Sequence, residues 1–201
     1  MKKNIFLSLA LSCATLFTMS LSAQNLTIEG LIETEQGQGI QGVTVTLRNA
    51  MNEVVASMVA DGAYAFNNLS AGTYTVQASK TDYPLNGVST FDVVLTSRHI
   101  LGIQPLGSPY KTLAADANND KKITTIDLVI ARTIILAMIE EFPDGQSWRF
   151  VNSDWTFPSP TNPWLGIEGI SNTVTLTTSN GSINFIGLKT FDVNNSADPE
   201  N

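Results

Sequence analysis

Residues 87–101 and 122–136 repeat one pattern at a spacing of 35 residues. Threonine, aspartate and valine recur at positions 90/125, 92/127 and 94/129, and an Ile-Leu pair recurs at 100–101 and 135–136. Each copy starts with a hydroxyl residue that can cap a helix, has an acid in the first turn, and continues with apolar residues at helical spacing. The sequence therefore predicts two duplicated helices, the first ending before Gly102.

The second copy follows a segment rich in oxygen-bearing side chains. Counted from Asp116, such side chains fall at positions 1, 3, 5 and 12 of a twelve-residue loop, and position 7 offers a backbone carbonyl. Calcium takes six to eight hard oxygen ligands, and this spacing wraps them around one ion. The predicted ligands are Asp116, Asn118, Asp120, the carbonyl of Lys122, and Asp127. An Asx-rich turn that only caps the helix is the alternative, and the apolar Ile123 at position 8 argues against it.

Residues 192–196 carry the first part of this spacing again, as Asp-x-Asn-x-Ser, with no helix pattern after it. The loop expected before the first helix is incomplete, because Tyr83 and Leu85 stand at its positions 3 and 5. We therefore expect a permuted arrangement, in which the late segment supplies the half-loop that the first helix lacks. The predicted ligands of this second calcium site are Asp92, Asp192, Asn194 and Ser196. A disordered polar tail is the alternative.

A calcium loop followed by one helix, repeated within residues 83–140, resembles the type I dockerin family. Dockerins are secreted calcium-binding modules that dock onto cohesin domains, so the resemblance implies a protein partner on a cell surface or in the extracellular matrix. Two positions depart from the family. Lys121 stands where the loop prefers glycine, and a positive φ there costs about 1 kcal/mol. Ser89 and Thr90 lie one position early for the recognition pair, which argues against a cohesin-like partner.

Residues 24–82 show short runs in which apolar and polar residues alternate, separated by glycine-containing turns. This pattern predicts an antiparallel β-sandwich. The segment from Asp61-Gly62 through Tyr64, Phe66 and Tyr74, together with residues 39–45, resembles the carboxypeptidase regulatory-like family. These are prealbumin-like sandwiches repeated in bacterial surface proteins, so the resemblance implies a spacer or adhesive module. We expect the three aromatic residues to be core, with a sugar-stacking face as the alternative.

Residues 141–201 contain all three tryptophans of the chain, Trp148, Trp155 and Trp164, among several prolines. Such a stretch predicts an extended strap packed over a neighbouring core, with a ligand platform as the alternative. Alternating residues on both sides of residues 179–182 predict a β-hairpin of 173–177 with 183–188. We expect this whole segment to pack on the dockerin-like unit. The prolines at 105 and 109 suggest that residues 105–115 are extended or irregular.

Residues 1–23 have the pattern of a secretory signal peptide: Lys2 and Lys3, an apolar run, and a cleavage site after Ala23. The run is too short to predict a membrane span. Lipidation at Cys13 is the alternative, and its preceding residues match less well. Cleavage removes the single cysteine, so disulfides, thiol nucleophiles and cysteine-bound zinc are excluded. We expect a secreted or cell-surface protein.

The net charge of −7 argues against nucleic acid as a partner. The single histidine, His99, lies within a predicted helix, and no Gly-x-Ser-x-Gly motif is present, so no catalytic constellation emerges. The expected fold is α+β overall, with an N-terminal antiparallel sandwich, a dockerin-like pair of loop-helix repeats and a C-terminal hairpin. The arrangement resembles the ends of large secreted Bacteroidetes proteins.

The expected function is a secreted, non-enzymatic calcium-binding module for extracellular adhesion, anchoring or protein assembly. The alternative is a carbohydrate-binding protein that uses aromatic faces of the sandwich or of the strap, which would make polysaccharide a second candidate partner. A small hydrolase is the least favoured class.

Overall fold

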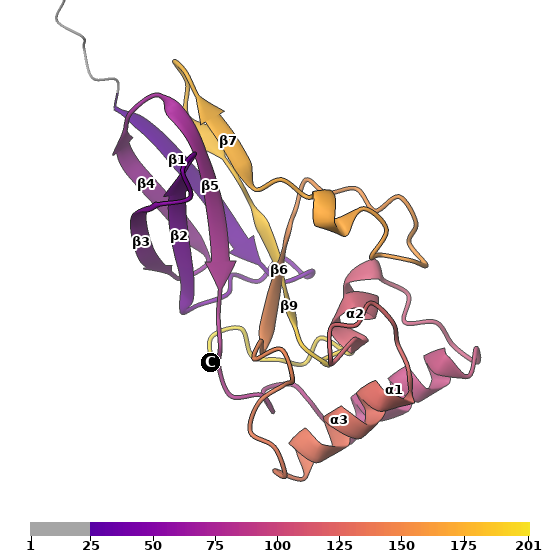
Figure 1. The fold of residues 1–201 in the computed structure, drawn as a ribbon. Coiled ribbons are helices and arrows are strands. Elements are labelled where there is room, and N and C mark those ends of the chain that lie inside the picture. Colours follow the sequence, from indigo (N-terminus) through magenta and orange to yellow (C-terminus); the bar gives the residue numbers. More distant parts are fainter. Residues whose placement is uncertain (1–24) are drawn as a thin grey trace, which may run out of the picture.

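The computed structural model describes residues 25–201, so the predicted signal peptide lies outside the described residues. Five strands come first: β1 (Leu26–Glu33), β2 (Val43–Asn49), β3 (Val54–Ala60), β4 (Ala63–Leu69) and β5 (Gly72–Ser79). Three helices follow: α1 (Thr90–Ile100), α2 (Pro109–Ala115) and α3 (Thr125–Ile135). The last elements are β6 (Trp148–Asn152), the 3-10 turn η1 (Ile167–Gly169), β7 (Thr173–Leu176), β8 (Gly181–Ser182) and β9 (Phe185–Lys189). Figure 1 shows the strands grouped at one end and the helices at the other, with β6 and β9 reaching between them.

Two sheets face each other. One has the order β4-β1-β9-β6, with β8 also paired to β1, and the other has the order β3-β2-β5-β7. Alternate residues of the strands point between the sheets, so Ile28, Val45 and Leu47 are fully buried. Tyr64 and Tyr74 are buried in the same core as Phe66. The predicted sandwich and its aromatic core are confirmed, and these rings are not available as a sugar-stacking face.

The predicted hairpin of residues 173–177 with 183–188 is wrong. β7 pairs with β5 in one sheet, whereas β9 lies between β1 and β6 in the other. The chain bends at residues 177–179, after which the side chain of Asn180 accepts a hydrogen bond from the Thr27 amide at 2.9 Å and Gly181 begins β8. The chain thus crosses from one sheet to the other at this bend. The C-terminal segment therefore completes the sandwich as well as contacting the helices.

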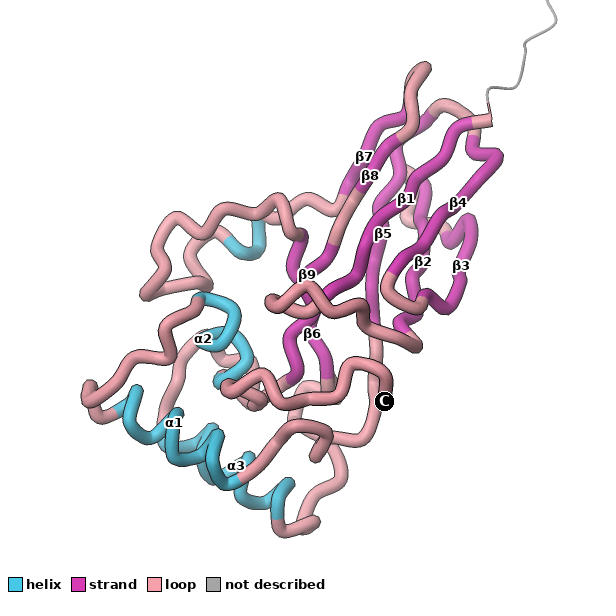
Figure 2. The backbone as a smooth tube through the Cα atoms, turned by 180° about the vertical axis from the view of Figure 1, so that it is seen from behind, coloured by secondary structure: helices cyan, strands magenta, loops and turns pink. Residues whose placement is uncertain are grey.

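Helices α1 and α3 are the two predicted helices, and both have 11 residues. Ser89 caps α1 and Thr124 caps α3, each in a capping box with the aspartate three residues later. Gly102 follows the end of α1 with a φ of 68°. The two helices lie side by side in both views (Figures 1 and 2). Between them lies a core that includes Val93, Leu128, Ile134, Phe142 and Phe191.

Helix α2 corrects the expectation that residues 105–115 are extended or irregular. Ser108 is its N-cap, and the hydroxyl accepts hydrogen bonds from the amides of Tyr110 and Lys111 at 3.1 and 3.5 Å. Pro109 occupies the first turn, where its fixed φ suits a helix and its missing N–H costs nothing. Ser108 followed by Pro109 is thus the signal that starts helix α2.

The proline-punctuated strap covers a third core. Trp155, Phe157 and Trp164 are partly buried against Leu113 of α2 and Leu188 of β9. Trp148, which begins β6, is instead part of the sandwich core and is 3% exposed. The strap therefore packs over the junction of α2 with the sheet.

Candidate metal centres

The first candidate centre lies where α2 ends. We call residues 116–121 half-loop A. The buried carboxylate of Asp116 accepts hydrogen bonds from the amides of Asp120 and Lys121 at 3.0 and 2.8 Å. Asp127, in the first turn of α3, is also buried and accepts from the amides of Ala117 and Thr124 at 2.9 and 2.8 Å. Two aspartates thus close one loop from opposite ends.

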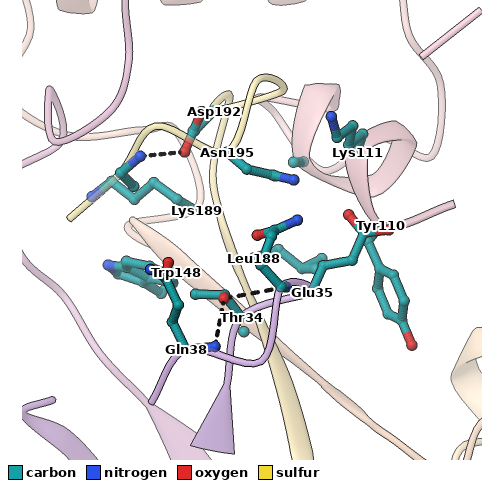
Figure 3. Close-up of a pocket in the computed structure, with 14 residues that line it drawn as sticks. Thr34, Glu35, Gln38, Tyr110, Lys111, Trp148, Leu188, Lys189, Asp192 and Asn195 are labelled. Carbon is teal, nitrogen blue, oxygen red and sulfur yellow. Dashed lines mark hydrogen bonds between the residues drawn. The ribbon is translucent and has the colours of Figure 1, made fainter. Parts of the chain in front are cut away.

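The second candidate centre repeats this geometry with residues from distant parts of the chain. We call residues 192–197 half-loop B. Asp192 accepts hydrogen bonds from the amides of Ser196 and Ala197 at 3.1 and 2.7 Å. Asp92, in the first turn of α1, accepts from the amides of Val193 and Ser89 at 3.0 and 2.9 Å. Figure 3 shows Asp192 and Asn195 of this half-loop beside the segment that leads into it from Lys189.

The two centres share three hydrogen bonds from backbone amides to carboxylates, and Asp92 also accepts one from the Asn194 amide at 3.2 Å. In each, the first aspartate binds the amides four and five residues ahead, and the helix aspartate binds the amide that follows the first aspartate. Asn119 and Asn195 hold the same place in the two half-loops and share a left-handed backbone, with φ of 58° and 60°. Lys121 also has the predicted positive φ, at 67°. The structure therefore brings Asp92 to the half-loop that contains Asp192, although 100 residues separate them.

The other predicted ligands lie differently in the two centres. In half-loop A, the side-chain oxygen of Asn118 accepts from the Asp120 amide at 3.2 Å, and the exposed Asp120 carboxylate accepts from the Asn118 side-chain amide and from the Lys122 backbone amide. In half-loop B, Ser196 donates its hydroxyl to the Gly87 carbonyl at 3.0 Å. The side-chain oxygen of Asn194 is buried and has no hydrogen-bond partner among residues 25–201 as the structure describes them. Asn194 stands at the predicted third position of the loop, so this oxygen is suited to a cation.

Within residues 25–201, no three side chains of His, Cys, Asp or Glu gather in a geometry that could hold a metal ion as they stand. In half-loop A, the Asp120 carboxylate is turned toward the loop backbone. To coordinate a cation at this centre, the Asp120 carboxylate would have to turn toward Asp116. The amide and carbonyl oxygens of the loop would supply the other ligands. The residue types suit calcium, which accepts carboxylate, amide and carbonyl oxygens together.

Burial raises the pKa of Asp116 and of Asp192 above the ordinary value. The neighbouring carboxylates, Asp127 and Asp92 respectively, raise these pKa values further, and the backbone hydrogen bonds oppose them. In each centre, then, two carboxylates with little access to water lie near one another. A bound cation would offset both the burial of these carboxylates and their mutual repulsion, because it favours the charged form of each acid.

A polar junction beside half-loop B was not expected from the sequence. Lys189 at the end of β9 is 3% exposed, and its ammonium group contacts the Asp82 carboxylate and the Tyr83 carbonyl. The Trp148 indole donates to the same carboxylate at 2.7 Å. Burial raises the pKa of Asp82, but the hydrogen bonds from Lys189 and Trp148 outweigh it and hold this pKa below its usual value. Burial lowers the pKa of Lys189.

The pocket beside this junction, lined by Glu35, Tyr110 and Lys189 among others, is shown in Figure 3 and has a volume of about 30 Å³. That volume suits water rather than a ligand. The junction is therefore a structural feature that ties the segment after β5 to the end of β9. No helix of the described part of the chain is long and apolar enough to cross a membrane.

Comparisons with known proteins agree with the N-terminal part of this description. The family model of the carboxypeptidase regulatory-like domain matches residues 27–101. Chitinase ChiA of Flavobacterium johnsoniae is 32% identical over 103 residues, which is 49% of this chain and 6% of the chitinase. The chain therefore spans only a small part of that relative. The matched range runs from the second residue of β1 to the end of α1, so this part of the chain is similar to the carboxypeptidase regulatory-like domain.

Proposed function

We propose that this protein is a secreted or cell-surface, non-enzymatic calcium-binding module that serves adhesion, anchoring or protein assembly. The observation that carries the proposal is the matched pair of half-loops, each closed by an aspartate from the first turn of a helix. In this proposal the unit is dockerin-like and permuted, because half-loop B comes from the far end of the chain and serves α1. The similarity to a Flavobacterium chitinase supports an extracellular setting.

Calcium suits these centres better than magnesium. Magnesium demands a near-ideal octahedral shell and keeps several waters, whereas calcium tolerates irregular sets of carboxylate, amide and carbonyl oxygens. Half-loop A would supply Asp116, Asn118 and Asp120, and the Lys122 carbonyl and Asp127 of α3 would complete the set. Half-loop B and α1 would supply Asp192, Asn194, Ser196 and Asp92. The ion's role would be structural, because it would neutralise a buried pair of aspartates in each centre.

An exposed apolar face on α1 and α3 supports a role in protein assembly. The exposed apolar residues occupy equivalent repeat positions on the two helices: Phe91 with Ile126, Val94 with Val129, and Leu101 with Leu136, all between 49% and 71% exposed. Clustered apolar side chains on a soluble protein commonly mark an interaction surface. These apolar residues recur at the same 35-residue spacing as Asp92 and Asp127, the helix aspartates of the two centres.

Calcium titration by calorimetry, with thermal melts alongside, tests the proposal on residues 24–201. We expect two ions, with affinities typical of extracellular loops, roughly 10⁻⁴ to 10⁻³ M. A tenfold excess over the dissociation constant should stabilise the fold by about 1.4 kcal/mol per site. Asp116→Ala should remove one ion and Asp192→Ala the other. Asp154→Ala changes an exposed acid outside both centres and should bind both ions.

Absence of heat and of any melting shift at millimolar calcium would refute the proposal. A single ion that survives Asp192→Ala but not Asp116→Ala would limit calcium binding to half-loop A and refute the permuted second centre.

Carbohydrate binding is the second candidate, and the position of the strap tryptophans favours it. Trp155 and Trp164 are partly exposed, unlike Tyr64, Phe66 and Tyr74 of the sandwich core. The relative named chitinase makes chitin a polysaccharide to try first. Retention of this protein on chitin beads, compared with Trp164→Ala, tests this candidate; no retention of either protein would count against it.

A further inference from the structure

A cavity of about 410 Å³ lies between the sandwich, half-loop A and the strap. Its walls come from the end of β5, from β6 and Gln146 before it, from residues 119 and 121 of half-loop A, and from strap residues 164–172, with Leu113 of α2 and Leu188 of β9. Small-molecule sites commonly have volumes of roughly 300 to 1,000 Å³. This cavity is therefore large enough for a ligand, whereas the pocket in Figure 3 is not.

One part of the cavity wall is aromatic and aliphatic. Trp164 and Phe150 line it, together with Ile167 and Ile170 of the strap. These four side chains are only partly buried, so they retain surface that a ligand could cover. An aromatic side chain buries a large area at little conformational cost, which makes it an effective anchor.

Another part of the wall consists of carboxamides. Asn119, Gln146 and Asn172 line the cavity, and their side chains make no hydrogen bond within the described part of the chain. The oxygen of Asn172 is also shielded from solvent, so it has no partner at all among the described residues. Asn152 is different, because its side chain donates to the Ser171 carbonyl at 3.3 Å and accepts from the Asp154 amide at 2.9 Å. Three carboxamide side chains that make no hydrogen bond among the described residues thus line one cavity.

This combination matches the chemistry of a saccharide. Each carboxamide both donates and accepts hydrogen bonds, and each sugar hydroxyl does the same. The C–H face of a pyranose ring is apolar and can lie against an aromatic ring such as Trp164. The described residues of the cavity include no Asp or Glu, whereas glycoside hydrolysis needs a pair of carboxyl groups. The lining therefore favours binding over cleavage.

The cavity shares its wall with half-loop A. The Lys121 amide donates to the Asp116 carboxylate at 2.8 Å, and Lys121 lines the cavity. Arg149, which also lines the cavity, donates to the Asp116 carbonyl at 2.6 Å and to the Leu113 carbonyl at 3.1 Å. An ion at Asp116 would therefore fix the backbone that carries Asn119 and Lys121.

We propose that this cavity binds a short saccharide, and that calcium at half-loop A strengthens the binding by ordering one wall. The coupling, though not the cavity itself, rests on the calcium function proposed above.

Three hexasaccharides test the proposal: cellohexaose, chitohexaose and hexagalacturonate, which are neutral, acetamido and acidic. Each is titrated by calorimetry into residues 24–201, once with excess calcium and once with EDTA. We expect at least one to bind, with an affinity at least fivefold lower in EDTA. Gln146→Ala should weaken binding about three- to tenfold, because one hydrogen bond is lost. Trp164→Ala should weaken it tenfold or more.

Gln36→Ala and Tyr83→Ala are the matched controls, since both side chains are exposed and neither lines the cavity. Both should leave saccharide binding unchanged. Trp164 also packs in the strap, so the decisive variant is Gln146→Ala, whose side chain is exposed and unbonded. A thermal melt of each variant shows whether it is folded.

Failure of this proposal is distinguishable from failure of the calcium function. If none of the three saccharides binds while calcium binds normally, the cavity proposal is overturned and the calcium function stands. Binding of equal strength in calcium and in EDTA would overturn the coupling. Binding that survives both Gln146→Ala and Trp164→Ala would place the saccharide elsewhere and overturn the assignment to this cavity.

Discussion

At the residue scale, Asp82 is the acid on which the junction between sheet and helices depends. Its partner Lys189 has a side chain only 1% exposed, so Asp82→Asn would leave a buried cation without its anion. Removing one partner of a buried pair costs about 3–5 kcal/mol. We therefore expect this loss of unfolding free energy at pH 7, measured by urea denaturation, with Asp154→Asn as the exposed control.

The same substitution should change the acid dependence of stability. Because the folded-state pKa of Asp82 lies below the ordinary value of 3.8, its contribution is present above that value and is lost as pH falls through the lower folded pKa. The difference between wild type and Asp82→Asn should therefore shrink when the urea measurement is repeated below pH 3.8. A difference that stays constant with pH would show that Asp82 is not ionised in the folded protein.

Gly30 lies where β1 is in close contact with the segment before β9. A Cβ atom at this position would lie 1.9 Å from the Ile183 carbonyl oxygen and 2.8 Å from the Tyr64 ring. The Tyr64 hydroxyl donates to that same carbonyl at 2.6 Å, so the contact cannot widen without losing a buried hydrogen bond. We expect Gly30→Ala to cost about 2–3 kcal/mol of unfolding free energy. Gly169→Ala is the control, because no atom lies within 4 Å of its added Cβ; equal losses would contradict the argument.

At the element scale, the caps of α1 and α3 connect helix stability to the proposed centres. Ser89→Ala and Thr124→Ala should each lower the unfolding free energy by about 1 kcal/mol. Because each capping box also holds the helix aspartate, Ser89→Ala should weaken only the calcium site of Asp92, and Thr124→Ala only that of Asp127. Calorimetry on the two variants checks this. Equal weakening of both sites by one variant would contradict it.

Elements with a strong local signature could be predicted from the sequence. The period-two runs of residues 24–82 predict the N-terminal strands, and a cap followed by an acid three residues later predicts α1 and α3. The short helix α2 has no such signature, because prolines at 105 and 109 favour irregular structure, and only Ser108 before Pro109 indicates that a helix starts there. The strands after residue 172 were found, but their partners were not. Pairing between β1 and β9 joins residues such as Ile32 and Phe185, which share no local pattern.

The candidate site likewise has parts that a local sequence pattern predicts and parts that no local pattern reveals. The spacing of half-loop A is visible within twelve residues, and half-loop B was found because it repeats that spacing. The junction of Lys189 with Asp82 was invisible, because a lysine at the end of a strand is ordinarily exposed and its partner lies 107 residues away. The cavity lined by Asn119, Gln146 and Asn172 likewise takes its walls from six separate stretches between residues 78 and 188, so only the fold reveals it.

At the scale of the whole molecule, the sandwich depends on strands that follow the helices. β9 lies between β1 and β6, and β7 covers the edge of β5. Trp148, Leu176, Ile183 and Phe185 belong to the sandwich core and are each less than 5% exposed. The helical part is therefore an insertion between two portions of the sandwich, each of which contributes strands to both sheets, and half-loop B begins three residues after the end of β9.

A truncated chain of residues 24–140 should therefore fail to fold, although it contains the regulatory-like match and all three helices. Burying one large apolar side chain is worth about 1.5–3 kcal/mol, so losing four costs roughly 6–12 kcal/mol, which is comparable to the whole stability of a typical domain. Loss of β9 also leaves β1 with an open edge. We expect no cooperative thermal transition for this truncation by circular dichroism, against a single sharp transition for residues 24–201. A cooperative transition in the truncated chain would show that β1–β5 form an independent sandwich to which the later strands are only added.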